Sequence, residues 1–290
     1  MNDILMKVQM FLDKANRDPV EISDEVLDEF AKSCRDALKR QFSDKRNERL
    51  TIRMSNIGRP LCTLQMEAAG TPAEQQPWSH KMKMLTGDVI EAGAIAIMRA
   101  AGVNIEAVSQ PVSLDIAGIT IQGTYDVKID GRIFDIKSAS PYAFANKFSE
   151  GSFSALQSDD SFGYVAQGFG YAEADNSRFG GWIAVDKVTG DWSVLEVPDG
   201  ALYEDAKRAS LDKIAANVTA LTKAEPFSRC FDEVEETFYR NPTGNRVLAF
   251  NCEYCAFKQA CWPGMKVMPD VNSKGMMPKI KYYTHIAEGN

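Results

Sequence analysis

The sequence of 290 residues predicts a mixed fold of the α/β or the α+β class, and three observations support this prediction. Apolar residues repeat at helical spacing over 78–101, and Gly102 stands where such a helix would end. The period then changes to two at Val112, Leu114 and Ile116, which is typical of a strand. The expected elements follow as helix, three strands, helix, two strands and helix, an order that builds a mixed core.

Composition places the chain among soluble globular proteins. Hydrophobic residues make up 44% and charged residues 25%, which excludes a disordered tail, a collagen-like chain and a disulfide-dense scaffold. The apolar stretch 89–101 is interrupted by Glu91 and Arg99, so we expect no membrane span. Residues 1–18 mix acidic with apolar residues, as an amphipathic helix does and a signal peptide does not. A cytoplasmic protein without a membrane partner is therefore expected.

The N-terminal region, 1–54, is expected to be helical and basic. Arg35, Lys39 and Arg46 recur at helical spacing and would share one face. This face either contacts phosphates or is simply solvated, and both interpretations stay open. The net charge of −7 repels nucleic acid, so a DNA partner would have to meet a local basic patch or a bound metal.

The elements after residue 102 begin with a hairpin. Strands are expected over 119–129 and 132–137, and Asp130-Gly131 is the dipeptide most typical of a two-residue turn. A loop with short helical pieces should cover 138–162. Its aromatic side chains either stack on unpaired bases or pack a small satellite core; they are Tyr142, Phe144, Phe148 and Phe153.

The rest of the chain suggests a helix through Tyr171, a second hairpin over 182–197 and an amphipathic helix after Pro198. We divide the chain into the N-terminal region 1–54, a core over 55–200, a helical segment over 201–265 and a tail over 266–290.

The two-residue turn fixes the register of the first hairpin. Ile129 should face Arg132, and counting back along both strands places Asp126 opposite Asp135. Because side chains alternate between faces, one face should be core: Tyr125, Val127, Ile129, Phe134 and Ile136. The other face is polar: Thr124, Asp126, Lys128, Asp135 and Lys137.

Two opposed carboxylates on this polar face need an explanation. Their Cβ atoms would lie only about 4.5–5.5 Å apart, and like charges so placed are destabilising. A divalent cation between Asp126 and Asp135 would remove the repulsion, and hard oxygen ligands suit Mg²⁺ or Mn²⁺. Lys137 would then be placed to orient water or stabilise charge on a phosphate. The alternative is a solvated polar face with two chance acids.

Further polar residues lie where they could join this site. Gln167 and Tyr171 stand at i and i+4, hence on one helix face. Glu91 lies in an otherwise apolar helix between Gly87 and Ala94, whose small side chains leave its carboxylate approachable. A glutamate at the boundary of a half-exposed helix is the plainer interpretation.

The order of these residues resembles the PD-(D/E)XK nuclease superfamily, and within it the RecB-type branch. The resemblance spans about residues 55–185 and rests on Glu91, Asp126, Asp135-Ile136-Lys137 and Gln167-x-x-x-Tyr171. It implies an α/β restriction-endonuclease-like core, in which a mixed central sheet is flanked by helices.

The resemblance also implies a role for each residue. Asp126, Asp135 and the Ile136 carbonyl would bind Mg²⁺ or Mn²⁺, and Glu91 would bind or support the metal. Lys137 would position the attacking water. Gln167 and Tyr171 would hold the scissile strand and the geometry of the site.

Three cysteines crowd into ten residues near the C-terminus. Cys252-x-x-Cys255 is followed by Cys261, and Cys62 is the candidate for a fourth ligand. This pattern is similar to that of iron–sulfur nucleases of the same superfamily, which implies a [4Fe–4S] cluster on these four thiolates. A Cys₄ zinc site and free thiols are the alternatives. Cys34 and Cys230 have no local partners and are expected to be plain buried thiols.

Together these features predict a metal-dependent DNA nuclease, most similar to stand-alone phage or bacterial exonucleases of recombination, repair or replication. DNA, as a single strand or as a duplex end, would be its partner, with a helicase or recombinase as a possible second one. The location would be the cytoplasm, or that of the host if the protein is viral. An endonuclease of the same fold, and a non-catalytic DNA-binding or scaffold protein with a Cys₄ zinc site, are the competing hypotheses.

Overall fold

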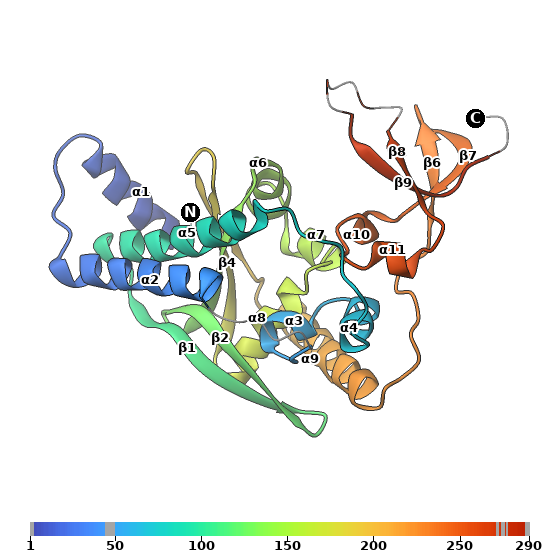
Figure 1. Cartoon of the computed structure of the whole chain (residues 1–290). Helices are drawn as coiled ribbons and strands as arrows, with labels where there is room; N and C mark the ends of the chain where they lie inside the picture. The colour runs from blue at the N-terminus through green and yellow to red at the C-terminus, as the bar shows by residue number, and fades with distance from the viewer. Residues whose placement is uncertain (1–2, 44–49, 271–272, 274–275, 277, 288–290) are drawn as a thin grey trace. The chain divides into compact units, whose positions relative to one another are not determined.

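A computed structural model describes residues 3–43, 50–270, 273, 276 and 278–287 (Figure 1). The chain divides into two compact units. Unit 1 comprises 1–47, 51–58 and 77–219, and unit 2 comprises 48–50, 59–76 and 220–290. Among the described helices, none is long and apolar enough to cross a bilayer.

Unit 1 is built on a mixed sheet of five strands, so the expectation of a mixed α/β architecture is confirmed. The strand order is β1-β2-β3-β4-β5, in which β3 and β4 are parallel and the other neighbours antiparallel. The strands are β1 Ile105–Ile116, β2 Ile119–Ile129, β3 Arg132–Ala139, β4 Arg178–Asp186 and β5 Trp192–Glu196.

Helices cover this sheet, and the sequence explains where the longer ones begin and end. In α2, Ser23 caps the first turn, acids occupy that turn, and Lys39 and Arg40 occupy the last, as the helix dipole favours. The described helices of unit 1 are α1 Asp3–Ala15, α2 Asp24–Phe42, α3 Met54–Ile57, α5 His80–Ala100, α6 Pro141–Ala143, the π-helix η1 Phe144–Ser149, α7 Phe153–Ser158, α8 Tyr164–Ala174 and most of α9 Ala201–Thr222.

The main core lies between the sheet and helices α1 and α5. The predicted pairing of Ile129 with Arg132 is confirmed, and four of the five predicted core residues pack here: Val127, Ile129, Phe134 and Ile136. Tyr125 is the exception, because its buried side chain turns to the other face, where its hydroxyl lies 3.4 Å from Asp175 Oδ1.

This change of face has a local cause at Asp126. The β2–β3 pairing ends at Val127 and Phe134, and the Asp126 carboxylate then accepts the N–H of Ile136. Opposite Asp126 in β1, Ser109 has a φ of 49° and belongs to no regular pair. A strand interrupted in this way bends, so the alternation of side chains does not continue through it.

The loop expected over 138–162 contains α6, η1 and α7. Phe144, Phe148 and Phe153 are buried, so these three rings pack a satellite core and are not free to stack on bases. Tyr142 is 70% exposed.

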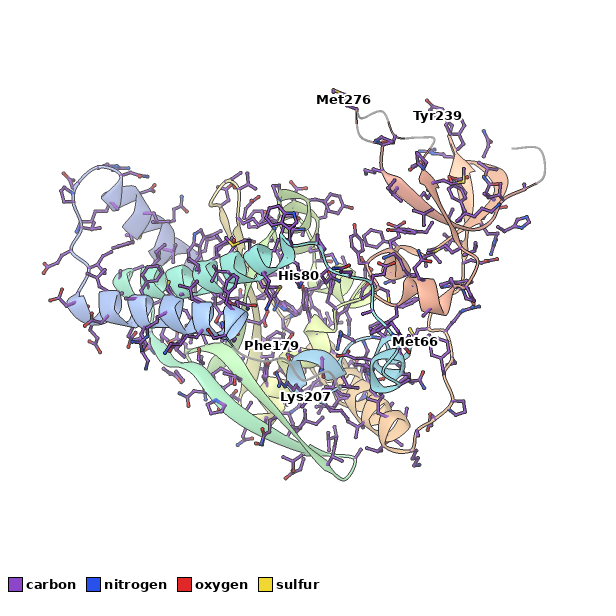
Figure 2. All side chains as sticks on the ribbon, in the orientation of Figure 1. Met66, His80, Phe179, Lys207, Tyr239 and Met276 are labelled. Carbon is purple, nitrogen blue, oxygen red and sulfur yellow. The ribbon has the colours of Figure 1, made fainter. Side chains whose placement is uncertain are left out.

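Unit 2 departs most from the expected elements. Its antiparallel sheet has the order β6-β7-β9-β8, with strands Val234–Phe238, Asn241–Val247, Ile280–His285 and Lys266–Pro269 in that order. Short helices accompany it: α4 Leu61–Ala68, α10 Phe250–Glu253 and α11 Lys258–Cys261. The expected helical segment over 201–265 contains α9, α10 and α11, but it also contains strands β6 and β7. The expected tail over 266–290 contains strands β8 and β9. In Figure 2, Tyr239 and Met276 project outward from unit 2.

Polar packing explains why these strands carry a weak sequence pattern. Glu236 is buried at the centre of β6, where it accepts hydrogen bonds from Asn245, Lys281 and Tyr283. Burial alone would raise the pKa of Glu236, but these hydrogen bonds lower it to about 2. Charged and amide side chains occupy positions where a strand pattern would show apolar ones.

Candidate active site and thiol cluster

The predicted acids and the predicted lysine meet where β2 and β3 separate. Asp126 Oδ2 accepts the N–H of Ile136 at 2.6 Å, and Asp135 Oδ2 lies 2.6 Å from Lys137 Nζ. Asp135 is 3% exposed. Because Ile136 faces the core beside α5, its neighbours Asp135 and Lys137 face the opposite layer, which contains α8.

The carboxylates of this site repel one another. Burial, Asp135 and Glu91 raise the pKa of Asp126 well above its ordinary value. Burial and the charges of Asp135 and Asp88 raise the pKa of Glu91 to about 7. Burial alone would lower the pKa of Lys137, but Asp135 and Asp126 raise it, so this side chain remains an ammonium. The single positive charge of Lys137 therefore does not balance the carboxylates of Asp126, Asp135 and Glu91.

Helix α8 brings the predicted glutamine and tyrosine to the same place. Gln167 Nε2 donates to the Tyr171 hydroxyl at 3.3 Å. Burial raises the pKa of Tyr171 to about 12, and the charges of Asp135 and Asp126 add to this effect. Glycines allow the close approach: a Cβ on Gly168 would overlap the Phe179 ring, and one on Gly123 would lie 2.6 Å from the Tyr171 ring.

Tyr164 belongs to this site and was missed in the sequence. Its ring centroid lies 4.6 Å from Lys137 Nζ, a cation–π contact. Burial raises the pKa of Tyr164, whereas Lys137 lowers it. The residue stands three positions before Gln167 on the same helix, so the spacing that selected Gln167 and Tyr171 could also have selected Tyr164.

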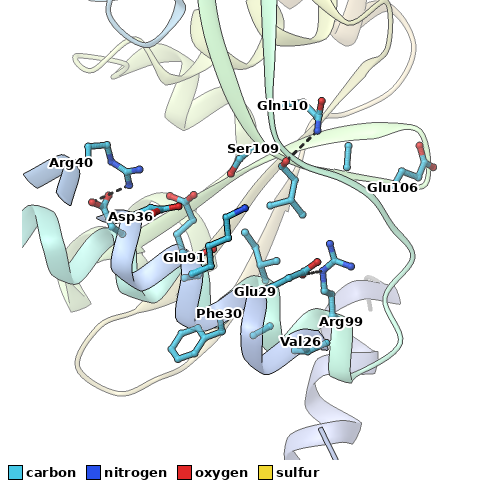
Figure 3. Close-up of a pocket in the computed structure, with 18 residues that line it drawn as sticks. Val26, Glu29, Phe30, Asp36, Arg40, Glu91, Arg99, Glu106, Ser109 and Gln110 are labelled. Atoms are coloured by element: carbon cyan, nitrogen blue, oxygen red, sulfur yellow. Dashed lines mark hydrogen bonds and ion pairs between the residues drawn. The ribbon is translucent and has the colours of Figure 1, made fainter. Parts of the chain in front are cut away.

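Glu91 also faces a cavity of about 560 Å³ between α2, α5 and β1 (Figure 3). Acids outnumber bases around it, and two of the bases are paired: Arg40 with Asp88 and Arg99 with Glu29, each at 3.1 Å. This cavity is therefore not a phosphate groove. Its lining includes Lys32 and Arg40 of α2.

The basic face proposed for the N-terminal region lies elsewhere on α2. Arg35 and Lys39 are exposed, and Arg35 Nε lies 3.7 Å from Asp36. Arg46 lies outside the described residues, so the face of three cations stays a prediction.

The four predicted thiols are neighbours within unit 2. Burial raises the pKa of Cys252 to about 11, and the charges of Cys62, Cys255 and Cys261 add to this effect. Burial and the charges of Cys62 and Cys255 likewise raise the pKa of Cys261. The Cys255 thiol lies 3.8 Å from Thr63 Oγ1, beside Cys62. The segments 59–76 and 220–290 of unit 2 thus both contribute to one thiol cluster.

Cys230 corrects the expectation of a plain buried thiol. It is exposed, and its Sγ accepts the N–H of Cys62 at 3.1 Å. A hydrogen bond with the Cys62 thiol lowers the pKa of Cys230 to about 6 and raises that of Cys62. No spacing motif includes position 230, so only the fold reveals it as a neighbour. Cys34 is half-buried in α2.

The pKa of Glu91 predicts how stability should depend on pH without divalent metal. Between pH 4.5 and about 7 the folded chain keeps a proton that the unfolded chain has released, so the free energy of unfolding should fall as pH rises. The loss is at most about 3 kcal/mol. Thermal melts in EDTA at pH 5 and pH 8 measure it.

Glu91→Gln should flatten this pH dependence, because it removes the titrating group and one charge that raises the pKa of Asp126. Glu21→Gln, at an exposed position outside the helices, is the control and should behave as the wild type. An unchanged slope in Glu91→Gln would show that this carboxylate does not hold the extra proton.

Comparisons with known proteins leave the family open. No family model matches the sequence, and no curated protein does. Among solved structures, SSO0001 is similar over 80% of this chain and 95% of its own, with 13% identity and a TM-score of 0.43. A protein of Eubacterium rectale, provisionally named an exonuclease, is similar over 49% of this chain and 57% of its own, with 15% identity and a TM-score of 0.35. Both likenesses are too distant to assign an activity.

Proposed function

We propose that this protein is a metal-dependent DNA nuclease of the PD-(D/E)XK type, RecB-like, which degrades DNA from an end. The observation that carries the proposal is the ion pair of the buried Asp135 with the partly exposed Lys137, beside Asp126, where strands β2 and β3 separate. Raised carboxyl pKa values next to a charged lysine are typical of sites built for catalysis or for a cation.

Mg²⁺ or Mn²⁺ fits the donor set of this site. Asp126, Asp135 and the Ile136 carbonyl would hold it, with Glu91 as a further ligand or support. Asp135 Oδ2 lies 2.6 Å from the Lys137 ammonium, and the charge of Asp135 raises the pKa values of Asp126 and Glu91, so a cation among these carboxylates would relieve their repulsion. Among the described residues, no three His, Cys, Asp or Glu side chains already surround one ion position, so the carbonyl and water would complete the shell. When bound, the metal supplies Lewis acidity toward the phosphate and a more acidic water.

The side chains of the chain divide the remaining work. The Lys137 ammonium, fixed by Asp135 and by the Tyr164 ring, orients the attacking water and stabilises charge on the phosphate. Gln167 and Tyr171, joined by a hydrogen bond, hold the scissile strand. Phosphodiester hydrolysis needs these functions in one place, and β3 and α8 provide them.

We further propose that Cys62, Cys252, Cys255 and Cys261 hold a [4Fe–4S] cluster in unit 2. The mutual influence of these thiols on their pKa values shows that they are close. Cysteine thiolates are the usual ligands of such a cluster, and unit 2 brings four of them near one another.

The partners follow from the proposed activity. The sequence has no Walker-type nucleotide-binding motif, so a separate helicase or recombinase would present the DNA end. The site of action would be the cytoplasm, that of the host if the protein is viral.

End dependence is the test that separates an exonuclease from an endonuclease of the same chemistry. Purified protein with Mn²⁺, and then with Mg²⁺, should degrade a linear single strand and leave a covalently closed circle of the same sequence intact. Gel analysis of both substrates over time measures the two rates. Equal loss of both would show an endonuclease, and persistence of both would argue for a non-catalytic DNA-binding protein.

A further inference from the structure

Two stacked aromatic rings, with a lysine at each end, form a row that leads from the active-site lysine to the surface of unit 1. Lys137 Nζ lies 4.6 Å from the centroid of the Tyr164 ring. Tyr164 stacks with Phe162, with centroids 5.4 Å apart and planes at 20°. Lys147 Nζ lies 5.7 Å from the Phe162 centroid. The Phe162 side chain ends this row of rings and is 47% exposed.

Local structure fixes the turn that carries Phe162. The Asp160 carboxylate accepts the N–H groups of Tyr164 and Val165 at 2.7 and 2.9 Å, and thereby caps α8. Gly163 supplies the left-handed conformation, with a φ of 76°, that joins the turn to the helix. The exposed ring is therefore held in place before any ligand binds.

The lysine at the outer end is positioned as well. Lys147 lies on the π-helix η1, a rare element that is frequent at functional sites. Next to it, the Phe148 carbonyl accepts the Ser193 hydroxyl at 2.8 Å, which ties η1 to β5. Lys147 Nζ lies 3.7 Å from Asp159 Oδ2, which is a loose ion pair. An ammonium with so weak an ion pair remains suited to a phosphate.

We propose that Phe162 and Lys147 bind one unpaired nucleotide next to the scissile phosphate, with its base against the Phe162 ring and its phosphate at Lys147. Every base has a π-face, so such a contact needs no particular sequence. Inside a duplex both faces of each base are covered by its neighbours, so a ring beside the scissile phosphate favours an unpaired strand. This inference rests on the proposed nuclease function and narrows its substrate to single-stranded DNA.

Binding of a fluorescent oligonucleotide tests this independently of cleavage. A single strand with 2-aminopurine is titrated with the full-length protein in Ca²⁺, and stacking of the base should quench its fluorescence. In Phe162→Ala the quenching should disappear and Kd should rise about 5- to 150-fold, the factor that corresponds to loss of one stacked base. Phe162→Trp should retain both signals, and Lys147→Met should raise Kd and reduce its dependence on salt.

Phe238→Ala is the matched control, because Phe238 is 41% exposed and also contacts a tyrosine, but lies in unit 2. It should leave quenching and Kd unchanged. Wild-type quenching and affinity in Phe162→Ala would overturn the subsite, even if the protein cleaves DNA. If the wild type never cleaves DNA but quenches the probe, and Phe162→Ala does not quench it, the nucleotide subsite would be supported and the nuclease function refuted.

Discussion

Asp135→Asn is expected to lower the rate of DNA cleavage by at least about a hundredfold, the scale for a group that acts on the transition state. Asp135 forms an ion pair with the Lys137 ammonium, and its charge raises the pKa values of both Asp126 and Glu91. Without this carboxylate, the proposed divalent cation would lose a ligand and Lys137 would lose its ion-pair partner. Initial rates on end-labelled DNA and calorimetric titration with Mn²⁺ measure the two effects.

The fold should tolerate this change. Removing one acid from a group of like charges relieves repulsion, and asparagine keeps the volume of the side chain. Asp175→Asn is the matched control, because it also breaks an aspartate–lysine pair, at 2.8 Å, that joins Lys128 of β2 to the C-terminal end of α8 outside the proposed site. It should cleave at the wild-type rate.

Lys137→Ala should be as inactive as Asp135→Asn while retaining its Mn²⁺ affinity, because the proposed lysine acts on water and phosphate. Wild-type cleavage by either variant would refute the proposed active site. Loss of secondary structure in both, seen by circular dichroism, would show instead that the ion pair serves the fold.

The sequence predicted the hairpin well because its turn leaves little freedom. A two-residue Asp130-Gly131 turn allows one register, and that register determines which side chains share a face. The prediction failed beyond Val127 and Phe134, where the regular pairing of β2 with β3 ends. Asp126 and Asp135 are therefore not a regular pair, and Tyr125 turns to the other face near the irregular backbone at Ser109. Such an interruption depends on a neighbouring strand and has no signature in β2 itself.

Contacts distant in sequence were less predictable. The helical spacing of Gln167 and Tyr171 also fits Tyr164, but only the fold shows that the Tyr164 ring lies against the Lys137 ammonium. Cys230 is 168 residues from Cys62 in the chain, so only the folded unit 2 shows that they touch. The strands of this unit were missed because Glu236 and its polar partners occupy core positions.

The thiol cluster predicts a colour and a local loss of stability. Protein purified without oxygen should be brown, with about four irons per chain and broad absorbance in the visible range. Cys255→Ala should remove the colour and most of the iron. All four proposed ligands lie in unit 2, so the loss should loosen segments 59–76 and 220–290 more than the sheet of unit 1.

Limited proteolysis followed by mass spectrometry locates this loss, because cleavage of the variant should concentrate within 220–290. Cys34→Ala is the control, since Cys34 lies on α2 in unit 1, and it should keep both colour and protease resistance. Cys230→Ala distinguishes a neighbour from a ligand. We expect it to keep four irons, because the proposed ligand set is complete without Cys230, which is hydrogen-bonded to Cys62 and also feels the charge of Cys252. A colourless wild type with one zinc per chain would refute the iron–sulfur cluster and favour a Cys₄ zinc site, and Cys255 would remain essential to unit 2 in that case too.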